Sequence, residues 1–367
     1  MDRRTAAAAA PFRISMQDAM NHRLQSIVYG LVFALIVGWV LYIGQGIFVP
    51  IIFSVLLAYV IFGLTRLLER IPGLGPALPL ALRYAVSVLA IGVLLFGFAL
   101  LFISQIGAVV ARAPEYLGDL LALIQQGAVA LGMESEPTWA SLRRDALSYI
   151  NLQRLLGSTA LLLTSLVAGL VVVVLYVAFM LVERAALPAK IDNLSSDPAQ
   201  VARVRQLLTG INTRIGAYLA LKTLINIITG LVTWAILALF GVEFAAFWAV
   251  LAATLNYIPY IGTVLSVAFP VLFAMLQFAD PGPVMSVLIA LSVAQFFTGH
   301  FLDPYVMGQS LNLSPLVILV SLAVWATLWG IPGAFLAVPM TACLVMILSE
   351  FPGTRPIAVL LSRHGKV

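Results

Sequence analysis

The feature that most limits how this chain can fold is a long stretch without a basic residue. From Thr223 to Thr354 there is no Lys or Arg, and the only charged residues are Glu243, Asp280, Asp303 and Glu350. Over the whole chain 62% of the residues are hydrophobic and 10% are charged. A soluble domain has about 25% charged residues. We therefore expect an integral membrane protein, in which each spanning helix takes about 20 apolar residues.

Several motifs that mark enzymes are missing from the sequence. It has neither the G-x-x-x-x-G-K-[ST] loop for nucleotide phosphates nor the G-x-S-x-G and H-E-x-x-H motifs of hydrolases. His22, His300 and His364 are far apart and Cys343 is the single cysteine, which argues against a metal cluster or an internal disulfide. The basic residues flank apolar segments and form no single patch. We expect no catalytic residue, cofactor, metal or nucleic-acid partner.

Apolar runs alternate with polar segments, which predicts an all-α integral membrane protein of about eight transmembrane helices. The predicted segments are a cytoplasmic N-terminal tail at 1–26, transmembrane helices 1–3 at 27–110, an extracytoplasmic amphipathic segment at 111–158, transmembrane helix 4 at 159–182, a cytoplasmic helical connector at 183–217, an apolar core at 218–350 and a cytoplasmic C-terminal tail at 351–367. The segment 111–158 fits helices on the bilayer surface, and equally a soluble hairpin packed on its own spans.

Two apolar stretches in the core are interrupted by proline and glycine. Ile258-Pro259 interrupts the first stretch and Ile331-Pro332 the second, and apolar half-helices flank each pair. Paired interruptions predict two broken or re-entrant helix units, here near 244–263 and 314–333. They also indicate where a transporter binds its substrate. The core at 218–350 is therefore the predicted transport core.

The positions of the basic residues predict which side each segment faces. If the N-terminus is cytoplasmic and each plain apolar run crosses once, most of the 20 Lys and Arg residues lie inside. The basic residues after Thr354 then place the C-terminus inside too, which requires an even number of crossings. Eight crossings are favoured over ten, since each half of a broken stretch is short for about 30 Å of hydrocarbon.

Polar and aromatic side chains at the two interruptions are candidates for a substrate pathway. Backbone groups freed by a break at membrane depth must face protein or a water-filled cavity. Amide, hydroxyl, phenol and indole groups there suit a small, hydroxylated solute. For each of Tyr257, Tyr260 and Trp329, a place in the interfacial aromatic belt is an equal alternative. The candidate pathway residues are Asn256, Tyr257, Pro259, Tyr260, Gly262, Thr263, Thr327, Trp329, Gly330, Pro332 and Gly333.

Four further residues, Asp303, His300, Lys222 and Asn226, are candidates for coupling or gating. Asp303 and His300 lie three apart on one helical face and could relay protons. We expect instead that Asp303 ends a helix near the interface, where Pro304 terminates it. Lys222 and Asn226 lie four apart on one face. We expect Lys222 to reach toward lipid phosphates, and the alternative is that it lines an inner vestibule.

Several ordered motifs resemble the autoinducer-2 exporter family of bacterial membrane proteins, densely over roughly 200–350. The resemblance implies eight spans, a bacterial inner-membrane location, and homo-oligomers, with pentamers as the expected form. The family is named for export of the quorum-sensing signal autoinducer-2, and some members are similar to sodium/proton antiporters. This chain lacks the Lys or Arg that relatives often carry in the Asp303–Ser310 loop. The matching motifs include Arg214–Thr223, Leu255–Gly262, Asp303–Leu311 and Gly333–Pro339.

Three functions remain open on this reading. The first is a secondary or passive permease that exports a small polar organic solute, with autoinducer-2 as a candidate. The second is a monovalent cation/proton antiporter with Asp303 as the titrating group, which ranks lower because buried carboxylates are scarce. The third is a scaffold or sensor without transport activity whose 111–158 segment binds a partner.

Overall fold

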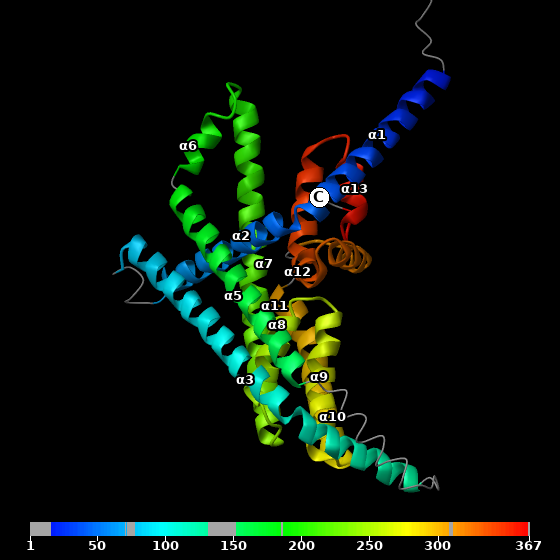
Figure 1. Cartoon of the computed structure of the whole chain (residues 1–367). Helices are drawn as coiled ribbons and strands as arrows, with labels where there is room; N and C mark the ends of the chain where they lie inside the picture. The colour runs from blue at the N-terminus through cyan, green and yellow to red at the C-terminus, as the bar shows by residue number, and fades with distance from the viewer. Residues whose placement is uncertain are drawn as a thin grey trace, which may run out of the picture. The chain divides into compact units, whose positions relative to one another are not determined.

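The computed structural model describes residues 16–69, 71, 78–130, 152–184, 186–307 and 311–365 (Figure 1). The chain divides into two compact units, Met1–Phe48 and Val49–Val367. Each unit is described by itself. Most of the predicted N-terminal tail, and residues 131–151 of the predicted segment 111–158, lie outside the described residues.

The described residues are helical almost throughout, which confirms the predicted all-α class. Helix α1 (Met16–Ile43) lies in the first unit, and α2 (Gln45–Glu69) continues from the first unit into the second. The second unit continues with α3 (Leu80–Ala130), α5 (Leu152–Glu183), α6 (Leu187–Asp192), α7 (Pro198–Leu239), α8 (Ala245–Leu255), α9 (Ile261–Phe278), α10 (Pro281–Phe297), the π-helical turn η1 (Thr298–Leu302), α11 (Asp303–Met307), α12 (Pro315–Glu350) and α13 (Arg355–Leu361).

Six of the described helices contain a stretch long and apolar enough to cross a membrane. These stretches are Gln45–Arg66, Leu80–Leu101, Pro198–Leu239, Ile261–Phe278, Pro281–Val306 and Pro315–Glu350. The apolar parts of α1, α5 and α8 are shorter: Val28–Ile43, Val167–Glu183 and Ala245–Leu255. The chain is thus a multi-pass membrane protein, and the predicted number of eight spans is not confirmed.

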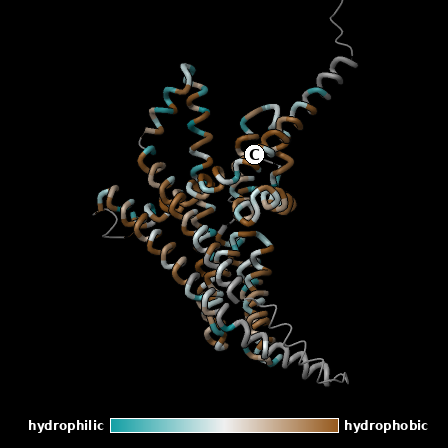
Figure 2. The backbone as a smooth tube through the Cα atoms, in the orientation of Figure 1, coloured by the Kyte–Doolittle hydropathy of each residue, from teal (hydrophilic) through white to brown (hydrophobic). Residues whose placement is uncertain are grey.

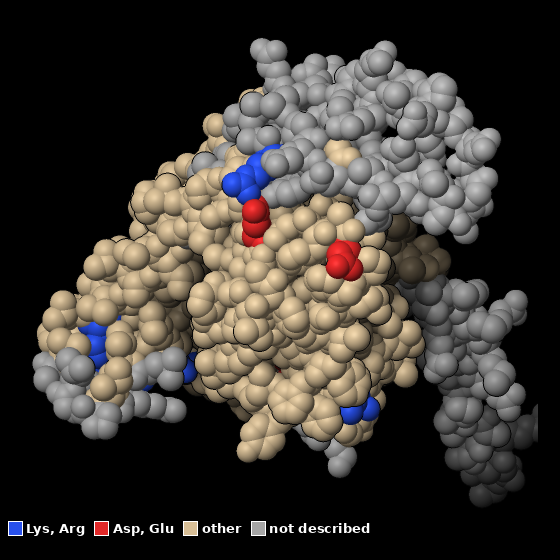
Figure 3. Space-filling view, turned by 90° about the horizontal axis from the view of Figure 1, so that it is seen from below, with Lys and Arg blue, Asp and Glu red and all other residues tan. Residues whose placement is uncertain are grey.

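The outer surface of the helices is apolar, as contact with lipid requires. Large hydrophobic side chains such as Leu89, Leu161, Phe179 and Val264 are exposed. Hydrophobic residues dominate α3, α5 and α8–α10, whereas hydrophilic residues gather in α6 and the first turns of α7 (Figure 2). The face seen from below carries few charged residues on an otherwise uncharged surface (Figure 3).

Helices α7, α8, α9 and α10 pack consecutively against one another. Their common core contains Leu237 from α7, Phe273 and Ala274 from α9, and Val287 and Leu291 from α10, all buried. This packing fixes the position of α8 and of the chain that follows it, which is where the first predicted interruption lies.

Helices α2, α3 and α5 form a second packed group. Ile61, Ile91 and Val177 are its buried residues. Within it, the hydroxyl group of Thr65 donates to the hydroxyl oxygen of Ser87 at 3.0 Å, and both side chains are buried. Such a bond satisfies both polar groups where water is absent.

Among the described helices, α1, α3, α5 and α7 each run across at least one predicted segment boundary without a break. Helix α7 is 42 residues long and joins the predicted connector at 183–217 to the transport core. Helix α3 is 51 residues long and continues past residue 110 into the predicted segment 111–158. The polar and apolar parts of the chain are therefore joined by continuous helix at both places.

Candidate functional site

Helix α7 carries a stripe of buried polar residues. Lys222, Asn226, Thr229 and Thr233 are all buried in an otherwise apolar packing. They follow one another at spacings of four, three and four residues, which places them on one face of the helix. Lys222 and Asn226 are among the candidates predicted from the sequence, whereas Thr229 and Thr233 are not. Their regular spacing is the signal that reveals them.

Lys222 of α7 forms an ion pair with Asp303 at the start of α11. Its Nζ atom lies 3.3 Å from Oδ2 of Asp303, and the two side chains are 9% and 27% exposed. The other carboxylate oxygen of Asp303, Oδ1, is buried and accepts no hydrogen bond within the described chain. Lys222 therefore does not extend toward lipid phosphates as expected. Each charge compensates the other in a region where an isolated charge is costly.

The expectation that a helix ends at Asp303 is wrong. The π-helical turn η1 leads directly into α11, whose first turn contains Pro304. The helical stretch therefore continues past Pro304 and ends at Met307. The turn η1 changes the helical register just before Asp303.

Two further contacts connect α7 to the chain after α8. Nδ2 of Asn256 donates to Oδ1 of Asn226 at 3.0 Å, and both side chains are buried. The hydroxyl groups of Thr223 and Tyr257 form a hydrogen bond of 2.7 Å. We refer to the six residues joined by these contacts and by the ion pair as the polar cluster: Lys222, Thr223, Asn226, Asn256, Tyr257 and Asp303.

The first interruption is a tight, strained turn. Helix α8 ends at Leu255 and α9 begins at Ile261. Tyr260 has φ 61° and ψ −57°, and the N–H of Ile261 donates to the carbonyl of Pro259 at 2.6 Å, which defines a γ-turn. A Cβ atom on Gly262 would lie 1.9 Å from the carbonyl oxygen of Leu255, so only glycine fits there.

The second interruption lies inside α12. Gly330 has φ 64° and ψ −140°, a conformation in which the helix direction changes and which glycine alone adopts readily. A Cβ atom on Gly333 would lie 1.9 Å from the carbonyl oxygen of Trp325. Both interruptions therefore use a glycine in direct contact with the carbonyl of the preceding half-helix.

The structure brings the two interruptions together. Ile258 from the first packs with Leu322, Ala334 and Ala337 of α12 in one buried group. The ring of Tyr257 lies 4.5 Å, centroid to centroid, from the ring of Phe335. The polar cluster thus borders both predicted broken units.

The predicted site residues differ in exposure. Lys222, Asn226, Asn256, Gly262, Trp329 and Gly333 are buried; Tyr257, Pro259, Thr263, Asp303 and Pro332 are half-buried; Tyr260, His300, Thr327 and Gly330 are exposed.

Several of these residues lie outside the polar cluster. The ring of His300 stacks on Phe296 with centroids 4.3 Å apart. Thr327 donates to the carbonyl of Ala323 in its own helix. Trp329 is buried against Trp325, with ring centroids 5.1 Å apart, and therefore belongs to no exposed aromatic belt.

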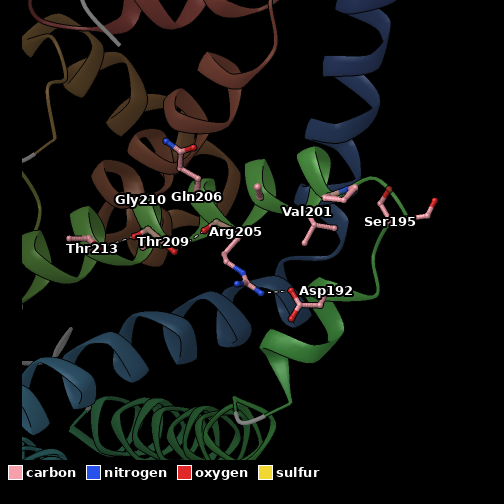
Figure 4. Close-up of a pocket in the computed structure, with 11 residues that line it drawn as sticks. Asp192, Ser195, Val201, Arg205, Gln206, Thr209, Gly210 and Thr213 are labelled. Atoms are coloured by element: carbon pink, nitrogen blue, oxygen red, sulfur yellow. Dashed lines mark hydrogen bonds and ion pairs between the residues drawn. The ribbon is translucent and has the colours of Figure 1, made fainter.

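A separate hollow of about 880 Å³ lies where α6 and α7 meet. Arg205 of α7 and Asp192 of α6 face each other across it and form an ion pair, while Thr209 and Thr213 continue along α7 (Figure 4). Both charged side chains are about half exposed. This hollow lies in the hydrophilic part of α7 and contains no residue of the polar cluster.

Comparison with known proteins supports a transport function. The model of the AI-2E family transporters matches residues 31–353. The "AI-2 transport protein TqsA" of Escherichia coli (strain K12) is 38% identical over 205 residues, which are 56% of this chain and 58% of that protein. The "Putative transport protein YhhT" of the same strain is 36% identical over 207 residues, 56% of this chain and 58% of that protein.

A longer match extends over most of the chain. The "Putative permease PerM" of Escherichia coli (strain K12) is 26% identical over 326 residues, 85% of this chain and 90% of that protein. The matches to TqsA and YhhT cover less than two thirds of those proteins.

Proposed function

Since the chain belongs to the AI-2E family of transporters, we propose that it is a permease that moves a small polar organic solute outward across the bacterial inner membrane. Transport is secondary or passive. The proposed route passes between the two interrupted helices, where backbone and side-chain polar groups replace the water around the solute.

The polar cluster is the observation that carries this proposal. It places two amides, two hydroxyl groups and an ion pair beside two helix interruptions in an apolar protein. Burying such groups costs free energy unless they are paired, and buried polar groups within membranes commonly mark substrate and ion pathways. A helix that only packs against lipid and apolar neighbours does not require buried polar side chains.

The cluster suits a neutral, hydroxylated solute. Amide and hydroxyl groups both donate and accept hydrogen bonds, while the ion pair leaves little net charge to attract an ion. The relative TqsA is named for transport of AI-2. We therefore propose autoinducer-2 as the first solute to test, followed by polyols of similar size.

Reconstituted protein gives a direct test of this function. Liposomes with the purified full-length protein should release an entrapped furanone or polyol faster than empty liposomes do. Repeating the assay with imposed sodium and proton gradients separates passive from coupled transport. Equal release from both kinds of liposome, for every solute tested, would contradict the proposal.

Cation/proton exchange is a second candidate, favoured by one observation. Oδ1 of Asp303 is buried without a hydrogen-bond donor within the described residues, as expected for a carboxylate that exchanges a proton for a cation. In this case Asp303→Asn abolishes sodium-driven proton movement in proteoliposomes. Unchanged proton movement in that variant excludes Asp303 as the exchanging group.

The proposed placement has both termini in the cytoplasm and the α6–α7 hollow on the cytoplasmic side. Arg205 lines that hollow, and Arg184, Lys190 and Arg203 belong to the same polar segment of the sequence, 183–217; the positive-inside rule favours the cytoplasmic side for such a segment. We also propose that the protein forms a homo-oligomer, with a pentamer as the expected form. Cysteine labelling of the two ends from each side of the membrane tests the orientation.

A further inference from the structure

Helix α12 folds back on itself at Gly330. The side chains of Trp325 and Thr341 join across the fold, where Nε1 of the indole donates to Oγ1 of the hydroxyl group at 3.1 Å. These residues are 16 positions apart, so in a straight helix they would be separated by about 24 Å. The halves 315–329 and 331–350 therefore lie against each other, and we call this unit the α12 hairpin.

The chain that follows α13 pairs with the chain that precedes α12. Leu313 and Ser362 face each other in an antiparallel β-bridge. Two backbone hydrogen bonds, of 3.2 and 3.0 Å, flank this pair, and a third bond of 3.1 Å joins the side chains of Asn312 and His364. We call this contact the C-terminal latch: Asn312, Leu313, Ser314, Leu361, Ser362, Arg363 and His364.

The latch closes the open end of the α12 hairpin. The first half of the hairpin begins directly after Ser314, and the second half leads through α13 to Leu361. The backbone N–H of Ser314 donates to the carbonyl of Leu361, so this bond ties the two halves together at the end opposite Gly330. The hydrogen bonds of the latch join only residues next to α12 to residues at the end of α13 or beyond it. They can therefore break while both helices stay intact.

Both halves of the hairpin border the proposed transport route. Leu322 of the first half and Ala337 of the second pack with Ile258 of the first interruption in one buried group. The second half also carries Phe335, whose ring lies 4.5 Å from the ring of Tyr257 in the polar cluster. Separation of the two halves would therefore loosen the packing beside the polar cluster.

We propose that the C-terminal latch gates the transport route by holding the α12 hairpin closed. While the latch is closed, the two halves stay in contact. When it opens, the halves separate about Gly330 and the route beside Tyr257 widens. The inference rests on the proposed function, because the gate acts on the proposed route. It gives the residues after α13 a regulatory role.

A disulfide across the latch tests whether it must open during transport. Leu313 and Ser362 are a directly opposed pair without mutual backbone hydrogen bonds, so their Cα atoms lie about 4.5 Å apart, a distance that a disulfide can bridge. The test protein is Leu313→Cys/Ser362→Cys with the single native cysteine removed by Cys343→Ala.

In proteoliposomes, oxidation of this double variant should slow solute release about tenfold or more, and reduction should restore it, because a locked gate limits turnover. Leu313→Cys alone, in the same background, is the control and should respond to neither treatment. Equal release by the oxidised and reduced double variant would overturn the proposal. Failure of the two cysteines to join would contradict the latch itself.

A second experiment detects opening of the hairpin without transport. Arg363→Pro removes the N–H that donates to the carbonyl of Asn312, and Ser362 already has φ −80° and ψ 153°, which suits a residue before proline. Arg363→Ala keeps the N–H and is the matched control. Ala337 is 0% exposed, so N-ethylmaleimide should reach Ala337→Cys, again with Cys343→Ala, only when the halves separate.

Labelling of Ala337→Cys should be about fivefold faster with Arg363→Pro than with Arg363→Ala, the effect of losing one hydrogen bond. Equal labelling rates would overturn the proposal. If Arg363→Pro does not fold, the oxidised and reduced forms of the double variant decide, since they are one protein in two states.

Labelling requires no transport, so the two proposals fail separately. Absence of solute flux in the native chain, together with faster labelling in Arg363→Pro, would overturn the proposed function and leave the latch as a control of the α12 hairpin. Solute flux that the disulfide does not change would overturn the gate and leave the proposed function.

Discussion

Nζ of Lys222 lies 3.3 Å from Oδ2 of Asp303, although 81 positions of sequence separate the two residues. This contact fixes α11 to the middle of α7. It also places opposite charges beside the helix interruption at Asn256–Tyr260, where the proposed transport route passes.

Removing either charge of this pair should destabilise the protein more than removing both. Asp303→Asn leaves the Lys222 ammonium without its counter-ion in a largely buried place, and Lys222→Met does the same to the carboxylate. The double variant should recover part of the loss, with a coupling free energy of about 0.5–3 kcal/mol. Unfolding of the detergent-purified variants measures this.

The ion pair between Arg205 and Asp192 is the matched control. Both of its side chains are about half exposed, so its coupling free energy should be only about 0.2–1 kcal/mol. Equal coupling at the two pairs would contradict the special role assigned to Lys222 and Asp303.

Alanine should be poorly tolerated at Gly262 and at Gly333. In each case the added Cβ atom would lie 1.9 Å from a carbonyl oxygen of the preceding half-helix, so the two halves must separate. Each substitution should cost about 1–3 kcal/mol of unfolding free energy and lower solute flux. Gly210→Ala in α7 is the control, since no atom lies within 4 Å of its Cβ position. Equal unfolding free energies for Gly262→Ala, Gly333→Ala and Gly210→Ala would rule out the close contacts between these glycines and the carbonyl oxygens.

Gly330→Ala tests backbone conformation alone. No atom lies within 4 Å of the Cβ position, but φ is 64° and ψ is −140°. Forcing alanine into this conformation should cost about 1–3 kcal/mol. Thermal unfolding of the variant in detergent provides the measurement. A melting temperature equal to that of the native chain would mean that α12 is not interrupted at Gly330.

Tyr260→Gly should have the opposite effect on stability. Tyr260 occupies the strained central position of the γ-turn and is 50% exposed, so glycine relieves strain and gives up little packing. We expect unfolding at the same or a higher temperature. Tyr257→Gly is the comparison and should lower it, because Tyr257 bonds to Thr223 and packs on Phe335. A larger loss for Tyr260→Gly would show that its side chain has a structural role.

The sequence alone predicts the parts of this fold that depend on local chemistry. Proline and glycine near Ile258 and Ile331 predict the two interruptions. Proline lacks a backbone N–H and glycine permits a positive φ, so each residue affects the helix at its own position. The all-α class follows from apolar runs, because a helix satisfies its own backbone within lipid.

Long-range pairing lies beyond such local rules. From its immediate neighbours in the sequence, Lys222 is expected to reach toward lipid phosphates and Asp303 to end a helix. The ion pair depends on how α11 packs against α7, and no spacing along the chain encodes that. The number of spans is similarly undetermined, because α1, α5 and α8 have apolar parts of intermediate length.

The most direct test of the account compares solute flux through two asparagine variants of α7. Asn226→Leu alters the polar cluster. Asn212→Leu is the control: it removes an exposed side chain of the same helix outside the cluster, whose Oδ1 accepts a hydrogen bond from the Tyr59 hydroxyl of α2. In liposomes with equal amounts of folded protein, we predict that Asn226→Leu slows solute release about fivefold or more, as the loss of a buried hydrogen bond implies, and that Asn212→Leu matches the native chain. Native flux in Asn226→Leu would contradict the assignment of the polar cluster as the transport site.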